Sequence, residues 1–127
     1  MGQQQLLLII LGVIIVGVAI AVGISLFSGQ STAANRDAML SDINNIGADG
    51  YQYKIKPTSM GGGNGVYTGY ALPTAYSTNP NATYTATAAA TTLTVLGVSK
   101  QDGTHQLQIV FAIDGAAGTV TYPGVTW

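Results

Sequence analysis

Cysteine is absent from the 127 residues, which excludes disulfides and thiolate metal ligands. Charge is also scarce, because charged residues make up 7% of the chain against about 25% in average soluble proteins. Five aspartates, three lysines and one arginine give a net charge of -1. A nucleic-acid partner is therefore not expected, since neutralising phosphates needs a strongly basic surface.

Residue types that carry catalysis or bind metals are equally few. His105 is the only histidine, and one imidazole without cysteine or glutamate makes no metal-site pattern. The sequence GGGNG at 61–65 follows a predicted helix and precedes a predicted strand, which reverses the order of phosphate-binding loops. We interpret it as a hinge. No local motif supports a Ser/His/Asp set, so we expect no enzyme activity, metal or cofactor.

The opening stretch, 1–29, contains an uncharged apolar run from Leu6 to Phe27. A transmembrane helix needs about 20 apolar residues to cross a hydrocarbon core of about 30 Å. A cleaved secretory signal would instead show a basic start and an apolar core of about 7–15 residues. No Lys or Arg precedes this run, and the run is too long. We therefore predict a transmembrane or assembly helix.

The helix is predicted to continue past the apolar run, from about residue 3 to about residue 54, because no proline occurs before Pro57. Residues 30–56 form its amphipathic half. The apolar stripe there recurs at helical spacing and comprises Met39, Ile43, Ile46, Gly50 and Tyr53. This half needs a sheet to cover its stripe.

Residues 57–65 are predicted to form a glycine-rich loop, and 66–127 a head domain of three to five antiparallel strands. Asp102-Gly103 indicates a hairpin between runs at 91–100 and 105–114. Leu107, Ile109, Phe111 and Ile113 alternate with more polar positions, the period of a half-buried strand. Further runs at 65–72, 83–90 and 118–125 are candidate strands. The expected fold class is α+β.

This plan resembles that of the type IV pilins: a glutamine-rich start, an apolar helix with few glycines, an amphipathic continuation and a small antiparallel sheet. The resemblance covers the whole chain as an architecture and is not a residue motif. It implies a structural subunit that is anchored in the inner (cytoplasmic) membrane before assembly and is polymerised by pilus assembly machinery. The implied product is an extracellular pilus of identical subunits, with helices in the core and sheets outside, used for instance in cell adhesion.

The resemblance places the assembly surface on the apolar helix. Gly17 with Ala21, and Ala19 with Gly23, form small-xxx-small pairs that allow close helix packing. The residues expected to form the surface are Gln5, Leu6, Leu7, Leu8, Ile9, Gly12, Gly17, Ala21, Gly23 and Phe27. The family usually carries glutamate at mature position five. Gln5 occupies that position if Met1 is the mature start; it can accept a hydrogen bond from an ammonium, but without the negative charge that a glutamate would add.

Processing at the amino terminus is also implied by the resemblance. Such pilins are cut from a short basic leader and are often methylated at the new first residue. We expect that a leader is removed before Met1, which is then the methylated residue; a cut after Gly2 is the alternative. Asn81 begins the one N-x-[ST] sequon, in a predicted loop, and is a candidate for glycosylation.

Two other functions stay open from the sequence. The chain also fits a pseudopilin, whose short periplasmic fibre serves a secretion system. It also fits a single-pass membrane anchor that carries an extracellular binding domain.

Overall fold

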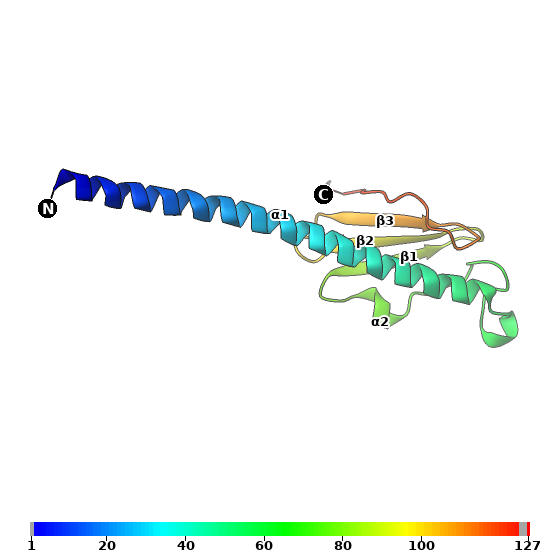
Figure 1. Ribbon diagram of the computed structural model, residues 1–127. Coiled ribbons are helices and arrows are strands. Elements are labelled where there is room, and N and C mark those ends of the chain that lie inside the picture. The colour runs from blue at the N-terminus through cyan, green and yellow to red at the C-terminus, as the bar shows by residue number, and fades with distance from the viewer. Residues whose placement is uncertain (1, 125–126) are drawn as a thin grey trace. The chain divides into compact units, whose positions relative to one another are not determined.

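The computed structural model describes residues 2–124 and Trp127, and the chain divides into two compact parts, Met1–Ala33 and Ala34–Trp127. The elements are helix α1 (Gln3–Ile55), the 3-10 turn η1 (Thr58–Met60), helix α2 (Thr74–Ser77) and strands β1 (Ala82–Ala88), β2 (Leu93–Ser99) and β3 (Gln106–Phe111) (Figure 1). This α+β arrangement confirms the predicted fold class. The bounds of α1 also match the predicted helix closely.

The only element in the described residues of the first part is the beginning of α1, residues 3–33. Its leucine, isoleucine and valine run is long and apolar enough to cross a membrane, and none of its most apolar window is buried within the chain. Such a helix needs no stripe to face a core, because lipid or other copies can surround it on all sides.

In the second part, the three strands form one antiparallel sheet in the order β1-β2-β3. The predicted hairpin at Asp102-Gly103 is confirmed. Gly103 adopts a φ of 73°, and the Asp102 carboxylate accepts hydrogen bonds from the backbone N–H groups of Thr104 and His105. These bonds close the turn between β2 and β3.

The prediction of a strand is wrong for two of the runs, 65–72 and 118–125. Residues 65–72 form turns, because Gly65 and Gly69 take φ values of 97° and 88° that interrupt an extended path. The described residues of 118–125 form no strand and meet β3 through an isolated bridge between Thr121 and Gln108 and a hydrogen bond from the N–H of Gly118 to the carbonyl of Val110. The sheet therefore has three strands, the lower end of the expected range.

The core lies between the second half of α1 and one face of the sheet (Figure 1). The predicted helix stripe is confirmed for four residues, and Tyr53 is only partly buried. The alternation of β3 also holds as far as Phe111, whereas Ile113 is 38% exposed. Among the described residues the first member of the core is Met39, so the preceding helix contributes no side chain to it.

Two glycines let the helix approach the sheet closely. A Cβ on Gly47 would lie 2.3 Å from the Phe111 ring, and one on Gly50 would lie 2.3 Å from Cδ2 of Leu93. Real Cβ atoms do not approach so closely, because interiors are close-packed. The predicted stripe included Gly50 but not Gly47.

The glycine-rich segment returns to the end of α1. The N–H of Gly63 donates to the carbonyl of Tyr53 at 2.9 Å, and the N–H of Gly65 donates to that of Lys54 at 2.7 Å. The last carbonyls of a helix have no partner within it. The segment that we interpret as a hinge therefore caps the helix.

Candidate functional site

An uncharged and almost entirely apolar surface extends from Leu6 to Phe27 in the first part of the chain. Every residue from Gly2 to Gln30 is exposed within the chain. The bulky side chains range from 50% exposed at Leu11 to 75% at Phe27. Single exposed leucines are ordinary, but a contiguous apolar surface of this length marks contact with a membrane or with protein.

All ten residues predicted for the assembly surface lie in this stretch and are exposed. Leu6, Leu7, Leu8 and Ile9 are consecutive, so at 3.6 residues per turn they point in successive directions around the helix. The structure thus arranges the predicted residues around a cylinder instead of gathering them into one pocket. A cylinder that is apolar on every side suits several neighbours at once.

The three glycines of the apolar run have no packing role inside the chain. A Cβ added to Gly12, Gly17 or Gly23 would meet nothing within 4 Å. Each costs about 1 kcal/mol of helix propensity relative to alanine. Glycine is frequent in membrane helices generally, and any packing reason for these three lies outside the chain.

The predicted modification sites differ in what surrounds them. Met1 lies outside the described residues. Asn81 is half-buried just before β1, and its backbone carbonyl accepts a hydrogen bond from the side chain of Asn35 at 3.2 Å. Glycosylation of Asn81 stays a prediction.

His105 belongs to the β2–β3 turn. Its Nδ1 contacts the Asp102 carboxylate, and its ring centroid lies 4.6 Å from that of Trp127. The backbone N–H groups of Thr104 and then His105 hold the pKa of Asp102 below its usual range. Across the described residues, no three His, Cys, Asp or Glu side chains gather where they could hold a metal.

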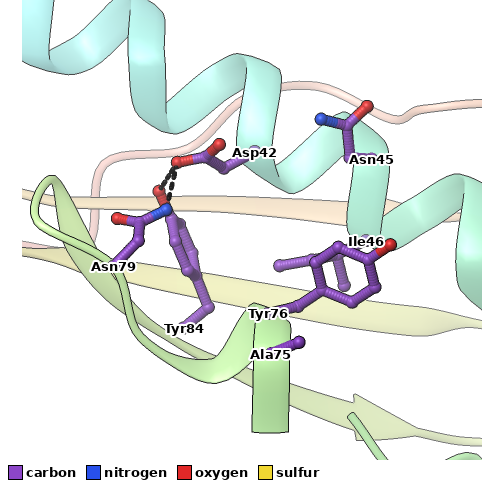
Figure 2. Close-up of a pocket in the computed structure, with 7 residues that line it drawn as sticks. All are labelled: Asp42, Asn45, Ile46, Ala75, Tyr76, Asn79 and Tyr84. Carbon is purple, nitrogen blue, oxygen red and sulfur yellow. Dashed lines mark hydrogen bonds between the residues drawn. The ribbon is translucent and has the colours of Figure 1, made fainter. Parts of the chain in front are cut away.

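One small pocket, of about 70 Å³, lies in the second part of the chain and is lined from α1, α2 and β1. Figure 2 shows Asn79 and Tyr84 pointing to a single carboxylate oxygen of Asp42. The Tyr84 hydroxyl donates to this oxygen at 2.6 Å and the Asn79 amide at 2.7 Å. Ligand pockets usually measure about 300–1,000 Å³, so this one has room for water but not for a substrate.

Two aspartates of α1, Asp42 and Asp49, join the helix to a strand and to loops, and the other three accept hydrogen bonds from their neighbours along the chain. Asp49 accepts a hydrogen bond from the Tyr70 hydroxyl at 2.8 Å, as Asp42 does from Tyr84. Asp114 accepts one from the backbone N–H of Ala116 at 2.9 Å. Asp102 accepts from the backbone of its own turn, and Asp37 accepts from the neighbouring Arg36 side chain at 3.5 Å, so all five aspartates have internal donors. Few charges are left for recognition at the surface.

Burial raises the pKa of Tyr67, Tyr70 and Tyr84 above the ordinary value of 10.0, and hydrogen bonds to aspartate raise the last two further. Below pH 10 these three phenols are neutral in both the folded and the unfolded chain. Above pH 10 the phenols lose their protons in the unfolded chain at a lower pH than in the folded chain. We therefore expect the free energy of unfolding to fall as pH rises, by up to about 1.4 kcal/mol per pH unit for each tyrosine.

Urea unfolding of the protein in detergent, from about pH 9 to about pH 12, measures this effect. Tyr84→Phe should make the free energy of unfolding fall less steeply with pH, because one of the three titrating tyrosines is removed. A stability that is constant across this interval would contradict the prediction.

Sequence reasoning missed a buried polar cluster beside Ser99, the one buried polar residue in the described part of the chain. Its hydroxyl donates to Oδ1 of Asn35 at 2.7 Å. A usable signal existed, because Ser99 continues the inward positions of β2 after Leu93, Val95 and Gly97.

The assembly surface and the pocket differ in scale and chemistry: the first is apolar and continuous, whereas the second is small and satisfied by its own hydrogen bonds. The apolar surface is therefore the candidate functional site. Comparison with protein-family models, with curated proteins and with solved structures yielded no match.

Proposed function

We propose that this chain is a structural subunit that polymerises through α1 into an extracellular type IV-like pilus filament. In the filament the helices lie in the core and the sheet domains lie outside. The observation that carries the proposal is the exposed apolar surface from Leu6 to Phe27. The overall plan, which resembles that of the pilins, supports it.

The apolar surface opposes a free monomer in water. Burying each bulky aliphatic side chain is worth about 1.5–3 kcal/mol relative to leaving it in water. A bilayer removes the same surface from water, so hydrophobicity alone does not favour the filament over the membrane. Close backbone approach at Gly17, Ala21 and Gly23 supplies the preference, and assembly machinery supplies the work.

Before assembly the subunit sits in the inner membrane, with the apolar run of α1 crossing the bilayer. After assembly Gln5 lies in the apolar core of the filament. There an amide is less costly to bury than a carboxylate and still accepts a hydrogen bond from a neighbour's terminal amine.

Electron microscopy of the protein purified from cells that assemble it tests the proposal. We expect thin fibres on the cell surface and in the purified fraction. A soluble monomer without fibres would overturn it, as would a solitary bilayer-bound molecule, which would instead favour an anchored binding domain. Fibres absent from the surface, with a secretion defect on deletion, would favour a pseudopilin.

A further inference from the structure

Asn64 and Gly65 form the only Asn-Gly pair in the sequence, and both residues are exposed. In such a pair the main-chain nitrogen of the glycine can attack the side-chain amide carbon of the asparagine, because glycine has no Cβ to hinder the approach. The other five asparagines precede residues that carry a Cβ. Asn64 is therefore the asparagine whose local sequence most favours deamidation.

This deamidation needs no reagent other than water. The nitrogen of Gly65 gives up its proton to water or hydroxide and forms a bond to Cγ of Asn64. The bond from Cγ to Nδ2 breaks, and Nδ2 leaves as ammonia after it has taken a proton from water. Water then adds to either carbonyl of the cyclic imide, which opens to aspartate or to isoaspartate.

The fold engages the atoms that this reaction needs. The N–H of Gly65 donates to the carbonyl of Lys54 at 2.7 Å, and the N–H of Asn64 donates to that of Lys56 at 3.0 Å. We call these two bonds, together with the one that Gly63 makes to the helix, the α1 cap. Among the described residues, Asn64 is the only one other than glycine with a positive φ, at 50°. The Gly65 nitrogen must leave its hydrogen bond before it can lose its proton and reach the amide.

We propose that Asn64 is a deamidation site that the α1 cap holds closed, and that its amide is converted to an acid only in chains whose cap has opened. Proteins open locally, and a reaction confined to the open state proceeds in proportion to the open population. The conversion is one-way, because ammonia is lost. Isoaspartate also adds an extra main-chain carbon between the two donors of Asn64 and Gly65, which then no longer match their carbonyls. The modified segment therefore does not restore the original α1 cap.

The full chain in detergent, folded and in urea at the same mildly alkaline pH, tests the inference. Peptide mapping by mass spectrometry follows the conversion at each asparagine with time. In urea, Asn64 should be converted faster than Asn44, which precedes another asparagine. In the folded chain the rate at Asn64 should be lower by about tenfold or more, because the closed state does not react. Equal rates with and without urea, or a rate in urea no faster than that of Asn44, would overturn the inference.

Gly63→Ala should release the site. A Cβ on Gly63 would lie 1.9 Å from the carbonyl oxygen of Val66, so the segment must shift. With the head still folded by near-ultraviolet circular dichroism, the rate at Asn64 should rise about tenfold relative to the rate of the same variant in urea. Ser59→Ala, at an exposed position in η1, is the matched control and should leave this ratio unchanged.

An unchanged ratio in folded Gly63→Ala, or an equal rise in Ser59→Ala, would contradict control by the α1 cap. If Gly63→Ala does not fold, the comparison of the wild-type chain with and without urea decides. Each of these outcomes is independent of whether the chain forms filaments.

Discussion

Replacing Gly47 with leucine should lower the free energy of unfolding of the head domain by about 3 kcal/mol or more. Three atoms of the Phe111 ring lie within 2.8 Å of the position that a Cβ would take. A leucine must push the ring or the whole strand away from α1. Because domains are stable by about 5–15 kcal/mol, a loss of this size removes a large part of the total.

Thermal unfolding followed by near-ultraviolet circular dichroism, on the full chain in detergent, measures the loss. Gly29→Leu is the matched control, because a Cβ added there would meet nothing within 4 Å. It should keep or slightly raise the midpoint, since leucine favours a helix over glycine by up to about 1 kcal/mol. An unchanged midpoint in Gly47→Leu would show that the sheet has room for the added side chain.

Replacing Gly17 with isoleucine should abolish filaments and leave membrane insertion intact. Nothing in the chain lies within 4 Å of the added Cβ, so the chain itself tolerates the change. Isoleucine also favours insertion into a bilayer. The loss is expected because, in the proposed filament, neighbouring helices approach closely at small residues.

Membrane fractionation and electron microscopy of the same cells separate the two steps. Gly29→Ile, which follows the apolar run, should still give filaments. Normal filaments from Gly17→Ile would show that close approach at this position is unnecessary.

The elements of the fold were predictable wherever one period dominates the sequence. The apolar run and the stripe containing Met39 and Ile43 gave the long helix, and the alternation through Leu107 and Ile109 gave β3. The segment 65–72 was mistaken for a strand, because its burial depends on partners far along the chain. The Tyr67 hydroxyl donates to the carbonyl of Ala112, and no local pattern reveals such a pairing.

The candidate site and the packing of α1 also combine features that the sequence reveals with features that it does not. The apolar helix was predictable because a long uncharged run is visible by itself. Gly47 was missed, since a glycine in a helix suggests weakness unless the facing ring of Phe111 is known. The cap formed by Gly63 and Gly65 was missed for a similar reason: a run of glycines indicates freedom, whereas their N–H groups are bound to the end of α1.

The core begins at Met39, and this has a consequence for how the chain is made. The ribosome delivers the apolar helix first, and the bilayer can accept it before any strand has been synthesised. In a bilayer-spanning chain, none of the described core residues would lie in the lipid. The extraction of the helix that the proposed assembly requires would therefore remove no core side chain from the folded head.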